Sequence, residues 1–167
     1  MHAPVLAAED EETDGFLLQM VFKKTGLFNV LVIVRDGQEA VNYLAGGPPY
    51  ADRSLHPLPG LLLLDLKMPR IDGFEVLKWV RQQPGLSSLR VVVLTSSEDI
   101  RDVNVAYKLG ANSFMVKPMD FEDVVHMSQF LSRYWLKLSK APDTFRQPRH
   151  RTSKPENSRN EPDGKHS

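Results

Sequence analysis

Several polar side chains in this sequence stand at the ends of short apolar segments. They are two adjacent acids, a third acid, a threonine and a lysine: Glu9, Asp10, Asp65, Thr95 and Lys117. Asp65 follows four consecutive leucines, and such an apolar run between turn residues is typical of a strand buried on both faces. A single aspartate there would ordinarily mark only the exit of the chain into solvent. Four apolar segments that all end in polar residues favour a shared chemical site.

The three acids have the chemistry of a magnesium site. If Glu9, Asp10 and Asp65 lie together, their charges repel one another, and a hard divalent cation relieves that repulsion. Mg²⁺ binds oxygen atoms in octahedral geometry and commonly uses only one or two carboxylates, with waters and phosphate completing its shell. We expect Asp10 and Asp65 to bind the metal directly and Glu9 to act through water. The backbone carbonyl of Lys67 could complete the protein ligands.

The same residues suit phosphoryl transfer. The ordinary pKa of an aspartate is about 3.9, so Asp65 is ionised at neutral pH and could attack phosphorus without a general base. The metal would offset the charge of the entering phosphoryl group. Lys117 would bring a positive charge to one phosphoryl oxygen, and the Thr95 hydroxyl could donate a hydrogen bond to another.

The surrounding pattern predicts the elements that position these residues. Short apolar segments alternate with segments of helical periodicity, and the expected strands span residues 4–8, 28–34, 61–64, 90–94 and 113–116. Strict alternation implies a parallel sheet with right-handed crossovers and helices on both faces. The predicted fold class is α/β, a flavodoxin-like doubly wound (βα)5 fold. Its five-stranded parallel sheet should have the order 2-1-3-4-5, which makes the first and third strands neighbours.

Local signals predict several helix boundaries and buried faces. Thr13 or Asp14 can cap the first helix, and Gly26 can end it. Helical spacing places four apolar residues on one face of that helix: Phe16, Leu17, Met20 and Val21. Ser97 is predicted to cap the fourth helix, and Phe121 at the start of the fifth is expected to pack in the core.

Residues 46–59 form a connection that is long for a compact domain. The segment has prolines at positions 48, 49, 57 and 59, which predict an irregular loop rather than a further helix or strand. The sequence leaves open whether this loop lies near the chemical site or at the opposite rim.

Composition limits the class of protein. The chain has 167 residues, with 21 Lys and Arg, 21 Asp and Glu, and no cysteine. The zero net charge gives no sign of nucleic-acid binding, and the lack of cysteine excludes disulfides and thiol catalysis. No apolar run is long enough to cross a bilayer and no signal peptide is present, so we expect a cytoplasmic protein without a membrane partner. Residues 1–140 form the predicted domain, and residues 141–167 are predicted to be a disordered tail.

As an ordered set, these motifs resemble the receiver domain of response regulators, the CheY-like domain of two-component phosphorelay systems. The matching pieces are Glu9-Asp10, the segment 61–69 around Asp65, Asp72-Gly73, Thr95-Ser96, Gly110-Ala111 and Lys117-Pro118. The resemblance implies that Asp65 accepts a phosphoryl group from a sensor histidine kinase in a Mg²⁺-dependent reaction. The receiver itself would catalyse this phosphorylation and the later dephosphorylation. Thr95 and Lys117 would bind the phosphoryl group, and Phe114 would change rotamer together with Thr95.

The output implied by the resemblance is a change in protein–protein contacts. Phosphorylation would shift helix four, strand five and helix five, and so alter homodimer formation or the binding of a downstream protein. Four aromatic residues lie on or near that face: Tyr107, Phe114, Tyr134 and Trp135. The long 46–59 loop and the lack of a DNA-binding output domain resemble the single-domain regulators that pair with bacterial phytochrome-type histidine kinases.

Two other functions remain as alternatives. A phosphatase or hydrolase with an aspartate nucleophile and Mg²⁺ would carry Asp-x-Asp at the end of the first strand. Here the candidate nucleophile, Asp65, follows the third strand, and Lys67 stands where the second aspartate would be. The other alternative is a receiver-like binding module that no longer accepts a phosphoryl group. All the residues needed for phosphorylation are present, which favours the phosphorylatable receiver.

Overall fold

The computed structural model describes residues 3–27, 30–96 and 98–138. Strands and helices alternate along these residues: β1 (Val5–Ala8), α1 (Glu12–Thr25), β2 (Leu31–Val34), α2 (Gly37–Ala45), β3 (Leu61–Leu64), α3 (Gly73–Gln82), β4 (Arg90–Thr95), α4 (Ile100–Lys108), β5 (Ser113–Val116) and α5 (Phe121–Leu138). The strands form one parallel sheet in the order β2-β1-β3-β4-β5, which confirms the predicted flavodoxin-like fold. The predicted tail at 141–167 lies outside the described residues.

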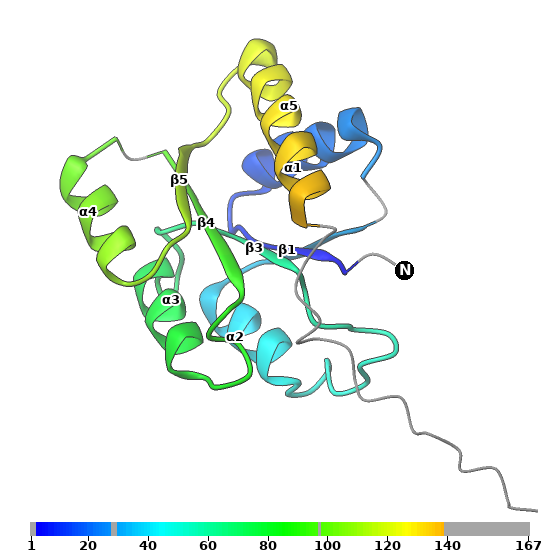
Figure 1. Ribbon diagram of the computed structural model, residues 1–167, viewed down its shortest axis with the longest axis vertical. Coiled ribbons are helices and arrows are strands. Elements are labelled where there is room, and N and C mark those ends of the chain that lie inside the picture. The colour runs from blue at the N-terminus through cyan, green and yellow to red at the C-terminus, as the bar shows by residue number, and fades with distance from the viewer. Residues whose placement is uncertain (1–2, 28–29, 97, 139–167) are drawn as a thin grey trace, which may run out of the picture.

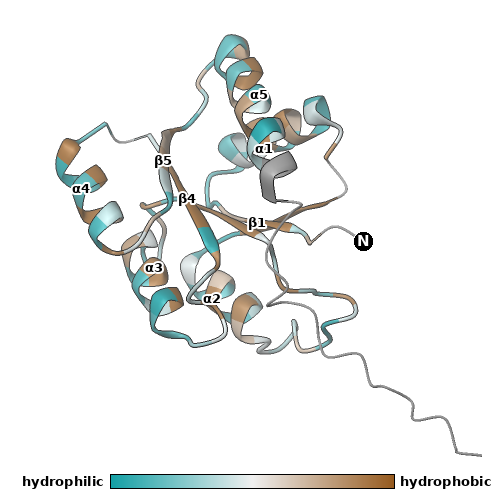
Figure 2. Ribbon diagram, in the orientation of Figure 1, coloured by the Kyte–Doolittle hydropathy of each residue, from teal (hydrophilic) through white to brown (hydrophobic). Residues whose placement is uncertain are grey.

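The sheet separates two layers of helices. α1 and α5 cover one face, and α2, α3 and α4 cover the other (Figure 1). Side chains of β3 alternate between the layers, because Leu62 and Leu64 pack with the α2, α3 and α4 side whereas Leu61 and Leu63 pack with α1 and α5. Figure 2 shows hydrophobic residues concentrated along β1 and most of β4, between the layers. Within the described residues, no helix is both long and apolar enough to span a membrane.

The first helix starts earlier than predicted. α1 begins at Glu12, and Glu11 takes the N-cap position without a side-chain cap hydrogen bond. Thr13 and Asp14 therefore lie within the first turn and do not cap the helix. An acidic side chain in this turn is favoured by the helix dipole, which puts partial positive charge at the N-terminus. Gly26 ends the helix with a φ of 74°, as predicted.

Two predicted core aromatics are instead exposed. Phe16 is 61% exposed, and the residues that α1 buries are Gly15, Leu18, Val21 and Phe22. Residues 16–22 are apolar at every position except Gln19, so helical periodicity could not decide which face of α1 packs on the sheet. Phe121, at the first position of α5, is 66% exposed because it lies beyond the carboxyl ends of the strands.

The fourth helix is capped by a different residue from the one predicted. Asp99 accepts a hydrogen bond from the backbone N–H of Arg101 at 2.9 Å and so occupies the N-cap, whereas Ser97 lies outside the described residues. Within α4, Ala106 is fully buried and Tyr107 is half exposed. This helix therefore rests on the core through a narrow contact.

The long connection between α2 and β3 lies at the amino ends of the strands, on the rim opposite Asp65 (Figure 1). Its Arg53 donates hydrogen bonds to the carbonyls of Tyr43 and Leu44 at the C-terminus of α2, each at 2.8 Å. The rings of Tyr43 and Tyr50 pack with centroids 4.9 Å apart. The location that the sequence left open is thus the rim away from the site, where the loop packs on itself and on α2.

Candidate functional site

The predicted site residues meet at the carboxyl edge of the sheet. Glu9 follows β1, Asp65 follows β3, Thr95 ends β4 and Lys117 follows β5, and all four side chains are buried. Parallel strands place their carboxyl ends along one edge, which is why residues so far apart in the sequence come together. Thr95 and Lys117 are held side by side by backbone contacts. Thr95 pairs with Val116 in the sheet, and Lys117 N–H donates a hydrogen bond to the Thr95 carbonyl at 2.8 Å.

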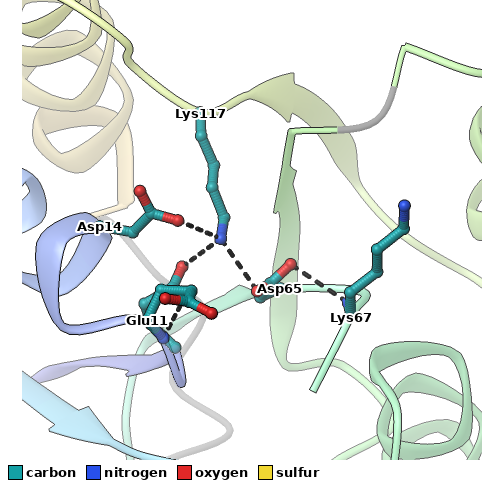
Figure 3. Close-up of polar contacts among 6 residues, drawn as sticks. Glu11, Asp14, Asp65, Lys67 and Lys117 are labelled. Carbon is teal, nitrogen blue, oxygen red and sulfur yellow. Dashed lines mark hydrogen bonds and ion pairs between the residues drawn. The ribbon is translucent and has the colours of Figure 1, made fainter.

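Lys117 forms the centre of the site. Its Nζ lies 2.7 Å from Glu9 Oε2, 2.8 Å from Asp14 Oδ2 and 2.9 Å from Asp65 Oδ2 (Figure 3). Burial alone would lower the pKa of Lys117, but the hydrogen bonds to Asp14, Glu9 and Asp65 outweigh it and raise the pKa above its ordinary value. The ammonium therefore stays charged at neutral pH and joins three elements of the fold.

The loop after β3 fixes the position of Asp65. Oδ1 of Asp65 accepts a hydrogen bond from Lys67 N–H at 3.2 Å, and Gly73 N–H donates to the Leu66 carbonyl at 2.9 Å. A Cβ on Gly73 would lie 2.2 Å from the Asp65 carbonyl oxygen, so only glycine allows α3 to start this close to the loop. The carboxylate is thus held on a backbone that has little room to move.

The acids at the site fit a divalent cation. Glu9, Asp10 and Asp65 each offer a carboxylate oxygen, and these oxygens lie within 4.8 Å of one another. Among the described residues, Asp10 Oδ1 is buried and has no hydrogen-bond partner. Burial raises the pKa of Glu9 to about 7, with the charge of Asp65 adding to the effect while Lys117 and the Glu11 N–H oppose it. An unpaired buried oxygen beside a carboxylate that resists ionisation is the environment that a hard cation stabilises.

Asp14 is the site residue that sequence reasoning missed. The sequence indicates only a possible helix cap at this position, yet the carboxylate contacts Lys117. A signal was available in the predicted topology, because the helix after the first strand begins at the carboxyl edge of the sheet and Asp14 lies in its first turn. Phe114, predicted to respond to Thr95, is partly buried against the core formed with α2, α3 and α4.

The fold and the site define the class of protein. A family model described as response regulator receiver domain matches residues 5–129, and the chain belongs to this family of two-component signalling domains. Among relatives, the response regulator Rcp1 of Synechocystis sp. is 36% identical over 138 residues, which cover 83% of this chain and 92% of Rcp1.

Two solved structures are also similar. The crystal structure of the Mn(2+)-bound form of Rcp1 has a TM-score of 0.71 at 36% identity and covers 81% of this chain and 95% of that chain. The phosphorylated cyanobacterial phytochrome response regulator RcpA has a TM-score of 0.74 at 32% identity, with the same coverage of 81% and 95%. The resemblance inferred from the motifs is therefore confirmed.

Proposed function

We propose that this receiver domain accepts a phosphoryl group on Asp65 from a sensor histidine kinase. In the reaction, a carboxylate oxygen of Asp65 forms a bond to phosphorus while the bond from phosphorus to the donor histidine nitrogen breaks, and the histidine leaves. The observation that carries the proposal is the buried Asp65 carboxylate, held 2.9 Å from the Lys117 ammonium at the edge of the sheet where the other acids meet.

A divalent cation, which we propose to be Mg²⁺, belongs to this function. Asp10 and Asp65 would bind it directly, Glu9 through water, and the carbonyl of Lys67 would complete the protein ligands. When bound, the cation supplies positive charge that lowers the repulsion between the acceptor carboxylate and the entering phosphoryl group. The partnerless Asp10 Oδ1 supports this arrangement, as does the Mn(2+)-bound structure of the relative Rcp1.

Lys117 and Thr95 would recognise the transferred group. The Lys117 ammonium lies beside Asp65 and could donate a hydrogen bond to a phosphoryl oxygen, and the Thr95 hydroxyl could donate to another. Because Thr95 ends β4, a hydroxyl that turns toward the phosphoryl group would pull on the segment that leads into α4. By this route the receiver would promote its own phosphorylation and dephosphorylation and would relay the phosphorylated state.

The output surface would be formed by α4, β5 and α5. Apolar side chains on these elements and the connection between them are exposed: Ile100, Val105, Tyr107, Val116, Met119 and Phe121. Such a group favours protein contact over solvent, so we propose that it binds a second copy of the chain or a downstream protein, without nucleic acid or membrane. The relatives described as phytochrome response regulators support a phytochrome-type kinase as the phosphoryl donor. We place the reaction in the cytoplasm. The receiver unit that takes part in it would span residues 1–140.

The test is the intact mass of the protein after incubation with acetyl phosphate and Mg²⁺. We expect one phosphoryl group on the wild type, none on Asp65→Asn and none when EDTA removes the metal. Asp52→Asn, the same substitution in the loop at the opposite rim, should be modified like the wild type. If no phosphoryl group is found, binding of beryllofluoride with Mg²⁺ separates rapid hydrolysis from a true lack of acceptor chemistry. Failure of both reactions would overturn the proposal in favour of a constitutive binding module.

A further inference from the structure

The acidic side chain of Asp14 has no part in the metal site or in the phosphoryl transfer described above. We propose that Asp14 is a positioning residue that holds Lys117 in the unphosphorylated protein and releases it when a phosphoryl group arrives. The charge of Asp14 would thus set how strongly the site binds a phosphoryl group. This inference rests on the proposed function of Asp65.

The hydrogen bonds of Lys117 favour such an exchange. An ammonium group has three N–H donors, and Lys117 Nζ already lies within 2.9 Å of three carboxylates, those of Glu9, Asp14 and Asp65. All the donors are therefore in use before any phosphoryl group is present. Bond formation to phosphorus frees the donor that faced the Asp65 carboxylate, but the phosphoryl group brings three acceptor oxygens. A second N–H of Lys117 can reach them only when Glu9 or Asp14 gives up its contact.

Burial identifies Asp14 as the carboxylate that can leave at least cost. The side chain of Asp14 is 30% exposed, whereas those of Glu9 and Asp65 are 1% and 4% exposed. A released Asp14 is hydrated at the surface, but a released Glu9 would remain a buried polar group without its partner. Glu9 also accepts a hydrogen bond from Glu11 N–H at 3.0 Å through its other oxygen, which keeps it in place.

The surroundings of Lys117 make the charge of Asp14 effective. Glu9, Asp14 and Lys117 line a small hollow between α1 and the end of β5, and most of its remaining wall is apolar: Leu17, Leu18, Leu94 and Pro118. Apolar walls keep water out and reduce the screening between charges. Asp14 therefore both competes for Lys117 and repels an incoming anion. Each of these effects weakens the binding of a phosphoryl group.

The experiment measures the affinity of beryllofluoride, a phosphoryl analogue, by titration calorimetry at saturating Mg²⁺. We expect Asp14→Asn to bind beryllofluoride about three- to tenfold more tightly than the wild type. The gain is limited because a partly exposed ion pair contributes only a modest free energy. Asp14→Glu should return the affinity toward that of the wild type, because it restores the charge. Glu12→Gln removes one negative charge from the same first turn of α1, at an exposed position, and should leave the affinity unchanged.

The outcomes separate this inference from the function on which it rests. Equal or weaker binding by Asp14→Asn would overturn the role of Asp14 while the wild type still binds the analogue. An equal gain in Glu12→Gln would also overturn it, because net charge near the site would then explain the effect. A wild type that fails to bind the analogue would show that the acceptor function itself is wrong, and the inference falls with it.

Discussion

α3 and α4 are neighbouring helices of the same layer, but they are attached to the sheet very differently. α3 begins with a full capping box between Asp72 and Glu75, and it buries Gly73, Val76, Leu77 and Val80. In α4, Ala106 is the one residue that is fully buried. The helix that follows residues 65–72, the acceptor loop that carries Asp65, is thus anchored, whereas the helix that follows Thr95 is loosely held. A change at the site would therefore shift α4 at much lower cost than α3.

The largest expected difference between the two helices is in core packing. Leu77→Ala should lower the free energy of unfolding by about 2–5 kcal/mol, because it leaves a cavity in a fully buried part of α3. The matched substitution Val105→Ala removes apolar atoms from a side chain of α4 that is 42% exposed, and it should cost less than about 1 kcal/mol. Urea unfolding followed by circular dichroism gives both values. Similar losses would contradict the difference in anchoring.

Gly73→Ala should be the next most severe change. The added Cβ would meet backbone atoms of Asp65 and Leu66, so the acceptor loop or the start of α3 has to move, at a cost of about 1–3 kcal/mol. Binding of beryllofluoride should weaken as well, because the displaced atoms carry the acceptor. Gly85→Ala is the control, since a Cβ there meets nothing within 4 Å, and it should leave both stability and binding as they are.

Arg81 anchors α3 to the turn after α4. Its Nη2 donates to the Gly110 carbonyl at 2.7 Å and its Nη1 to the Leu89 carbonyl at 2.7 Å. Arg81→Met keeps the aliphatic stem but leaves these carbonyls to water, and should cost about 1–2 kcal/mol. Hydrogen exchange should speed up most at the C-terminal end of α4. Lys78→Met, on the exposed side of α3, should change neither the free energy of unfolding nor the hydrogen exchange of α4. Equal effects of the two variants would show that Arg81 does not anchor α3 to the turn after α4.

The smallest expected effect is a gain in stability. Arg70, in the acceptor loop, has a φ of 68°, a conformation that costs a residue with a Cβ about 1 kcal/mol relative to glycine. Arg70 also forms an ion pair with Asp36 at 3.6 Å, but its side chain is 70% exposed, so this ion pair contributes little to the stability of the fold. Arg70→Gly should therefore raise the melting temperature slightly, whereas Lys67→Gly in the same loop should lower it. A loss of stability in Arg70→Gly would show that the loop is not strained.

The sheet could be predicted from the sequence because its rules are strict. A run such as Leu61–Leu64 needs cover on both faces, and alternation with helices leaves few topologies. The grouping of polar residues at strand ends follows from the same rules. Phe16 and Phe121 could not be placed, since the apolar stretch in α1 fits more than one face and Phe121 begins its helix beyond the sheet.

The part played by Asp14 could not be predicted for another reason. Its contact with Lys117 joins residues 103 positions apart in the sequence, and it depends on where α1 begins. Because α1 starts at Glu12, Asp14 lies inside its first turn, where the carboxylate contacts Lys117 instead of capping the helix. Single-residue signals for capping do not fix helix starts to better than one or two residues, and here that margin decides the chemistry of the side chain.

The loop between α2 and β3 offers a point of attachment for experiments. Leu55 in this loop is 72% exposed, and the chain has no cysteine. Leu55→Cys would thus create a single thiol on the rim farthest from the acceptor. Coupling a dye to this thiol, or attaching the thiol to a sensor chip, would leave the whole carboxyl edge of the sheet facing the solution. Binding partners could then be collected and ranked with every molecule presented in one orientation.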